Sequence, residues 1–178
     1  MMNKSYQRRH LRAPFKGPVL LTDGIDVFKA PALNISEGGM LLTQIPRLPQ
    51  NDDIHIMFAL PIIPLFKSLD LSKIQPISRD LLKKRIIRIS GKISRKVDSR
   101  YGLEFPVIDP LTKQYIEEYV TTYSANLIFL QTLIDSCRDN ETKIKTHILA
   151  TILGHDQNGN MLTLKESVSH DFKSLQWL

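Results

Sequence analysis

The chain has 178 residues, with 24 lysines and arginines against 18 aspartates and glutamates, five histidines and one cysteine. This length suits one domain with an appendage, or two very small domains, and it can bury a core without disulfide staples. The single cysteine excludes a disulfide framework and a cysteine-based zinc site. No apolar stretch approaches the roughly 20 residues of a membrane-spanning helix, and the N-terminus has no apolar signal core, so we expect a cytoplasmic protein.

The positive charge is concentrated in two segments. Residues 1–17 carry five bases and no acid, and residues 67–100 carry eleven bases and three acids. The segments between and after them have more acids than bases. Either basic segment can face an anion, so charge alone leaves open a nucleic acid, a small anionic ligand or an acidic partner.

Residues 1–16 contain little apolar material and are predicted to form a flexible arm. Short runs with strand-like alternation and turn signals follow, which predicts a mainly β protein with a small six-stranded antiparallel barrel over residues 17–109. Residues 61–84, rich in proline and then in bases, are predicted to be an insertion with one helical turn near Arg79–Lys84. The predicted strands cover residues 19–22, 26–36, 40–44, 54–60, 87–97 and 101–105.

Asp109 and Pro110 predict the start of a long helix over residues 110–138, because an acidic N-cap followed by proline is a typical helix start. Apolar residues spaced alternately by four and three form a seam on this helix. The seam has two interpretations: it packs on the chain's own barrel, or part of it binds a second copy in a homodimer. Its members are Ile116, Val120, Tyr123, Leu127, Leu130, Ile134 and Cys137.

The C-terminal extension, residues 139–178, carries two competing signals. An Asn-Gly pair at 158–159 lies between two apolar runs, the first at 148–153, which is typical of a hairpin. We therefore expect a small α/β extension, with a hairpin followed by a short terminal helix. Three isoleucines at four-residue spacing fit a helix instead: Ile144, Ile148 and Ile152.

No motif predicts catalysis or a resident metal. The sequence has no P-loop, GxGxxG fingerprint or nucleophile elbow. The loop that starts at His155 resembles a calcium loop but has its glycine at the fourth position and lacks the bidentate glutamate. Cys137 lies on the helix seam and is predicted to be inert packing. We therefore expect neither an enzyme nor a catalytic cofactor.

Two polar clusters suggest a binding site. Arg8, Arg9 and Arg12 lie in a segment that buries nothing, and their guanidinium groups offer rigid bidentate donors. Asn34 and Ser36 share one face of their predicted strand and precede two glycines. Taken alone, each cluster also has a plain interpretation: a solvated basic tail and an ordinary β-turn.

Together and in this order, the clusters resemble the PilZ domain family of bacterial cyclic di-GMP receptors. That family is marked by RxxxR followed, across a strand, by [D/N]xSxxG; here these are Arg8–Arg12 and Asn34–Gly39. Tyr101–Phe105 also looks like the closing strand of the family. The resemblance covers about residues 5–110 plus a following helix, and it implies a PilZ-type barrel.

The resemblance implies a receptor or adaptor in second-messenger signalling, with cyclic di-GMP as regulatory ligand and a downstream protein partner. Arginine reads guanine O6 and N7 bidentately and also pairs with phosphate, and Gly39 would keep a side chain away from a base. We expect the arm to order over the ligand, with the strand and turn as its floor. By similarity, the ligand-binding residues are Arg8, Arg9, Arg12, Asn34, Ser36 and Gly39.

Two other functions compete with this one. A PilZ-like protein-interaction module without nucleotide binding would be expected to have lost these motif residues, which are present here. A nucleic-acid-binding barrel would use Arg88, Lys92 and Lys96, but that strand has no aromatic residue on which bases could stack. We therefore expect no nucleic acid polymer as partner, and we assign segment 67–100 to a surface that meets a protein.

Overall fold

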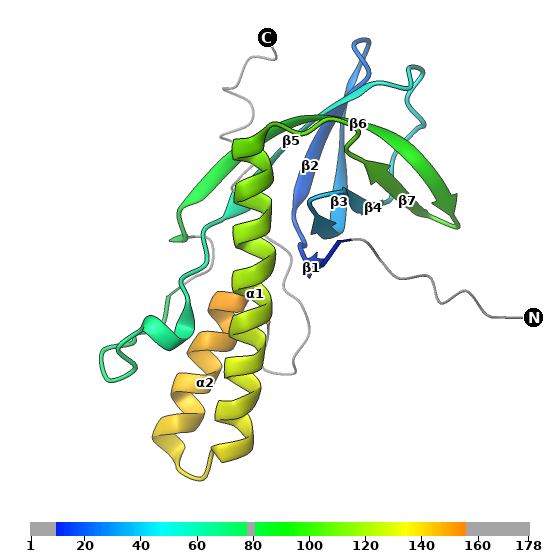
Figure 1. Cartoon of the computed structure of the whole chain (residues 1–178). Helices are drawn as coiled ribbons and strands as arrows, with labels where there is room; N and C mark the ends of the chain where they lie inside the picture. Colours follow the sequence, from blue (N-terminus) through cyan, green and yellow to red (C-terminus); the bar gives the residue numbers. More distant parts are fainter. Residues whose placement is uncertain (1–9, 78–80, 156–178) are drawn as a thin grey trace, which may run out of the picture.

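The computed structural model describes residues 10–77 and 81–155 (Figure 1). Several of the predicted features lie outside these residues. They are Arg8 and Arg9, Arg79 of the predicted helical turn, and the Asn-Gly turn at 158–159 with the terminal helix after it.

The described residues form an antiparallel sheet of seven strands that closes on itself. Six strands follow one another in the order β3-β2-β5-β6-β7-β4, and β4 pairs back with β3 to close the barrel. The seventh, β1, pairs with β3 beyond the end of β2. The predicted six-stranded barrel is thus confirmed, with one extra strand. The strands are β1 Ala13–Pro14, β2 Pro18–Thr22, β3 Val27–Ser36, β4 Gly39–Thr43, β5 Ile54–Pro61, β6 Lys84–Val97 and β7 Arg100–Glu104.

Each of the two longest strands pairs with two neighbouring strands, and this closes the barrel. The first half of β6 pairs with β5 and the second half with β7, while β3 passes from β2 to β4 in the same way. The pairing register shifts near Ala32 in β3 and near Ile93 in β6. Such bulges bend a strand and increase its twist, so they allow it to turn the corner of a small barrel.

Residues 13–15 belong to the barrel rather than to a flexible arm. Ala13 and Phe15 are fully buried, and the Phe15 ring lies 5.5 Å from that of Phe58 and 6.2 Å from that of Tyr119. The predicted arm, residues 1–16, therefore ends earlier in the structure, at Arg12. A single buried aromatic residue within a basic segment outweighs the polar character of its neighbours.

Helix α1, Pro110–Ser136, begins where the sequence predicts, with Asp109 accepting a hydrogen bond from the Thr112 amide at 2.9 Å. It packs on β1, β3 and β5. Four members of the seam are buried, so the seam packs within the chain for most of its length. These four are Ile116, Val120, Tyr123 and Leu130, while Leu127 and Ile134 are about half exposed.

The extension begins with a second helix, α2, Asn140–Leu153, which packs beside α1 (Figure 1). The prediction of a strand at 148–153 is wrong. Asp139 caps the helix by accepting from the Thr142 amide at 2.8 Å, and Gly154 ends it in the left-handed conformation, with φ of 94°. The helix was indicated instead by the four-residue spacing of the isoleucines.

The insertion between β5 and β6 is docked on α1 instead of standing free. A short 3-10 helix, η1, Phe66–Ser68, buries Phe66 completely. Asn126 of α1 accepts from the Phe66 amide at 2.9 Å and donates to the Pro64 carbonyl at 2.8 Å. Within the predicted turn near Arg79–Lys84, Leu81 has 3-10 conformation and Lys84 already belongs to β6, while Arg79 lies outside the described residues.

No helix within residues 10–77 and 81–155 has the length and apolar character required to cross a membrane. The same residues contain no group of three or more His, Cys, Asp or Glu side chains that could hold a metal ion.

Candidate functional site

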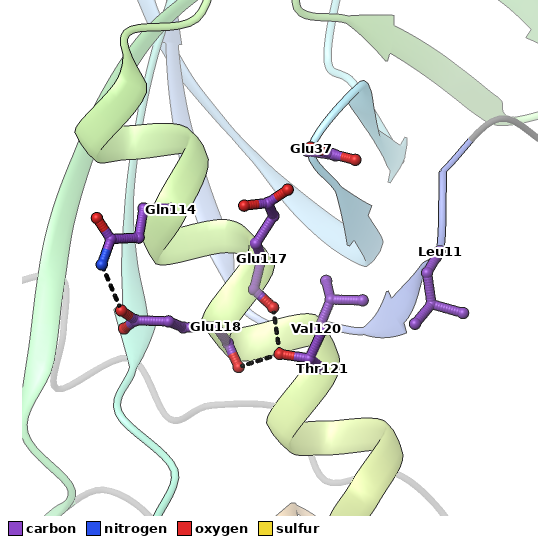
Figure 2. Close-up of a pocket in the computed structure, with 7 residues that line it drawn as sticks. All are labelled: Leu11, Glu37, Gln114, Glu117, Glu118, Val120 and Thr121. Atoms are coloured by element: carbon purple, nitrogen blue, oxygen red, sulfur yellow. Dashed lines mark hydrogen bonds between the residues drawn. The ribbon is translucent and has the colours of Figure 1, made fainter.

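The last residues of the arm, the β3–β4 turn and the first half of α1 meet at one end of the barrel. In Figure 2, Leu11 of the arm and Glu37 of the turn face Glu117 and Val120 of α1. The space between them is a pocket of about 400 Å³. The residues that line it are Leu11, Glu37, Gln114, Glu117, Glu118, Val120 and Thr121.

Arg12 and Asn34 come together although 22 residues separate them in the sequence. The antiparallel pairing of β1 with β3 places Pro14 opposite Asn34. The Arg12 guanidinium then donates from Nη1 to Asn34 Oδ1 at 3.5 Å, at the long end for a hydrogen bond. Arg12, just before β1, is exposed, whereas Ala13 of β1 is buried. The structure thus joins one residue from each sequence motif.

Ser36 lies inside the turn, with only 2% of its surface exposed. Its hydroxyl donates to the Gly39 carbonyl at 3.2 Å and so closes the β3–β4 connection. The hydroxyl proton already has an acceptor, so Ser36 has only its oxygen lone pairs to offer a ligand. Its predicted role in ligand binding stays a prediction.

Gly39 is explained by the pairing of β4 with β7. A Cβ atom at this position would lie 2.1 Å from the Leu103 carbonyl oxygen, which is far inside contact distance. The barrel therefore needs glycine here whether or not a ligand is present. The sequence analysis also predicted that Gly39 leaves room for a base of the ligand. That role is separate from the strand pairing and stays a prediction.

Sequence reasoning assigned no role to His10, yet its side chain contacts the turn. His10 Nδ1 lies 2.9 Å from Glu37 Oε1, and Lys113 Nζ of α1 lies 3.3 Å from Glu37 Oε2. The hydrogen bond from His10, together with the nearby ammonium of Lys113, lowers the pKa of Glu37 below its ordinary value. No local pattern reveals this contact, because 27 residues separate His10 from Glu37.

The residues that directly follow the arm are fixed to the core. The Tyr119 hydroxyl of α1 donates to the Pro14 carbonyl at 2.7 Å, and the Phe15 ring packs edge-on against Tyr119. Pro14 and Phe15 are thus held against α1.

The fold is a closed six-stranded antiparallel barrel, with an N-terminal segment paired to the strand that carries Asn34 and Ser36. The family model described as "PilZ domain" matches residues 6–122, and the chain belongs to the PilZ domain family.

Several solved structures resemble the chain at low sequence identity. The Bacillus subtilis inhibitor of motility (MotI/DgrA) is 16% identical with a TM-score of 0.50, over 67% of this chain and 52% of that one. The chain thus spans about half the length of that protein. The PilZ domain of Escherichia coli YcgR with c-di-GMP is 12% identical with a TM-score of 0.40, over 74% and 99%. The Borreliella burgdorferi PlzA protein in complex with c-di-GMP is 16% identical with a TM-score of 0.41, over 65% and 41%. A search of curated proteins gave no match.

Proposed function

We propose that this chain is a cyclic di-GMP receptor and adaptor in bacterial second-messenger signalling, without catalytic activity of its own. The observation that carries the proposal is the contact between Arg12 and Asn34, which joins the two motifs of the PilZ family at one surface. Membership of that family supports the choice of ligand. This role places the protein in the bacterial cytoplasm.

The chemistry of the Arg12–Asn34 surface suits the proposed ligand. Cyclic di-GMP combines guanine edges, which present acceptors at O6 and N7, with phosphates that carry negative charge. Arginine can pair with either group in a bidentate manner, and the amide of Asn34 offers both donors and an acceptor. The neighbouring pocket is lined by three glutamates, so it disfavours phosphate. We therefore assign the phosphates to the Arg12 side of the site.

We further propose that the arm orders over the bound ligand. In the sequence, Arg9 and Arg8 precede Arg12 by three and four residues, and Pro14 and Phe15 anchor the chain that follows. Tethering raises the effective concentration of these two guanidinium groups at the ligand. The ligand would gain their contacts at the cost of ordering a few residues.

Isothermal titration of the full chain with cyclic di-GMP tests the proposal. Wild-type protein should bind at micromolar concentration or below. Arg12→Ala and Asn34→Ala should each weaken binding by at least about tenfold, the loss expected when a charged or bidentate hydrogen-bond partner is removed. Arg138→Ala, at an exposed arginine after α1, is the matched control and should bind like wild type.

Absence of heat with wild-type protein at micromolar concentration would refute the nucleotide-binding role and leave a protein-interaction module. A steep salt dependence of oligonucleotide binding would instead favour the nucleic-acid-binding alternative. Unchanged affinity of Arg12→Ala would refute the role assigned to the arginine.

As an adaptor, the protein needs a surface for a partner, and we propose the outer face of β6. Arg88 and Lys92 share this face and are exposed. Lys96 is exposed too, but the register shift near Ile93 moves it to the other face, where its ammonium lies 5.5 Å from the centre of the Tyr101 ring. A homodimer would use the part of α1 that the barrel leaves uncovered, where Leu127, Ile128 and Ile134 are 45–71% exposed. Size-exclusion chromatography with light scattering, with and without ligand, tests the homodimer: a monomer in both conditions would refute it.

A further inference from the structure

We propose that His10 is a positioning residue of the ligand site. In this proposal, the His10 ring packs against Gly38 and hydrogen-bonds to Glu37. These contacts hold the arm against the β3–β4 turn and orient Arg12 toward the ligand. The inference rests on the proposed cyclic di-GMP function and adds a residue that lies between the two arginines of the RxxxR motif.

The ring of His10 occupies space that a side chain at position 38 would enter. A Cβ atom at Gly38 would lie 2.6 Å from His10 Cδ2 and 3.1 Å from Nε2. The backbone of Gly38 lies outside the left-handed region, whereas Gly24 and Gly154 have positive φ. Conformation therefore does not require glycine at position 38, and the seat of the imidazole ring supplies the reason for it.

Glu37 connects three parts of the fold through one carboxylate. Its Oε1 faces His10 Nδ1 of the arm at 2.9 Å, and its Oε2 faces Lys113 Nζ of α1 at 3.3 Å. The Glu37 side chain is 22% exposed, so solvent screens these contacts less than it would on an open surface. The arm is thus joined both to the turn that carries the second motif and to the helix behind it.

Arg12 lies in the sequence between two residues that are held in place. His10 fixes the chain two residues before it, and the Pro14 carbonyl is held by Tyr119 two residues after it. Between them, Arg12 contacts Asn34. A side chain that is ordered before binding loses less conformational entropy on binding, so the tether increases affinity without touching the ligand.

The central experiment is titration of cyclic di-GMP into the full chain carrying His10→Ala or Gly38→Ala. We expect each variant to bind about five- to tenfold more weakly than wild type, the effect of losing one modest contact that preorganises the site. The double variant should bind no more weakly than the weaker single variant, because both changes remove the same seat. His147→Ala, at an exposed histidine of α2, is the matched control and should bind like wild type.

A conservative variant and a ligand-free measurement separate positioning from general damage. Asparagine carries an amide nitrogen where histidine carries Nδ1, so His10→Asn should recover part of the affinity that His10→Ala loses. Without ligand, the ¹⁵N heteronuclear NOE of residues 10–12 should be high in wild type and fall in His10→Ala.

Unchanged or tighter binding by His10→Ala would overturn the inference, and so would additive losses in the double variant or an NOE that His10→Ala leaves unchanged. The NOE needs no ligand, so it reports on the tether independently. If wild type binds no cyclic di-GMP but the NOE falls in His10→Ala, the proposed function fails and the tether stands, without its effect on the ligand.

Discussion

Asn126 offers a sharp test of how the insertion is held against the barrel. The residue is fully buried in α1, accepts a hydrogen bond from the Phe66 amide at 2.9 Å and donates one to the Pro64 carbonyl at 2.8 Å. Asn126→Leu keeps a side chain of similar size but leaves both backbone groups without a partner. Each orphaned group costs about 1–3 kcal/mol, and the leucine regains part of this through apolar burial. We therefore expect the free energy of unfolding to fall by about 3 kcal/mol.

Urea denaturation and thermal melting measure the effect of Asn126→Leu. For a chain of this length, about 3 kcal/mol corresponds to a midpoint lowered by about 6–12 °C. Gln131→Leu, at an exposed site on the same helix, is the control and should stay within about 0.5 kcal/mol of wild type. A loss below about 1 kcal/mol in Asn126→Leu would show that the two backbone groups find other partners and that Asn126 does not hold the insertion.

Three other predictions follow from single contacts. Gly39→Ala should lower the free energy of unfolding by about 2 kcal/mol or more in urea denaturation, because its Cβ would lie 2.1 Å from the facing carbonyl of β7; a stability equal to wild type would refute this. Tyr119→Phe removes the bond to the Pro14 carbonyl and should cost about 0.5–1.5 kcal/mol by the same assay and also weaken cyclic di-GMP binding. The backbone amide of Gln50, with other donors, holds the pKa of Asp23 well below its ordinary 3.8. Stability from Asp23 is therefore present above about pH 4 and lost as the pH falls below it, so denaturation at about pH 3 and about pH 6 should differ less in Asp23→Asn than in wild type.

Local signals in the sequence were sufficient for the elements whose stability is local. The alternation of apolar and polar residues predicts the strand at 87–97. In the structure this strand, β6, begins earlier, at Lys84, and ends at Val97 as predicted. Asp109 and Pro110 predict the start of α1 because capping and proline act within one helical turn. The two motifs predicted one shared ligand site. The structure brings Arg12 and Asn34 together through the pairing of β1 with β3, and their role in binding stays a prediction.

The features that sequence reasoning missed depend on contacts between distant residues. The bond between Asn126 and the Phe66 amide joins residues 60 apart, and no periodicity reveals it. The extension carried a hairpin signal and a helical signal of similar strength. The helix prevails because Asp139 caps it and because packing on α1 buries residues such as Leu149, which the four-residue pattern alone did not include. Tertiary burial, rather than local propensity, decided between them.

The adjacent glycines of the second motif have different physical reasons, and this changes how mutations in it are interpreted. Gly39 is needed for the pairing of β4 with β7, and Gly38 for the ring of His10. Loss of ligand binding after a change at Gly39 would therefore report a damaged barrel before it reported a lost ligand contact. Arg12 is exposed and Asn34 is half-buried on the barrel surface, and their replacement removes no buried core contact. Among the described motif residues, only substitutions at Arg12 and Asn34 can test recognition of the ligand without also lowering the stability of the fold.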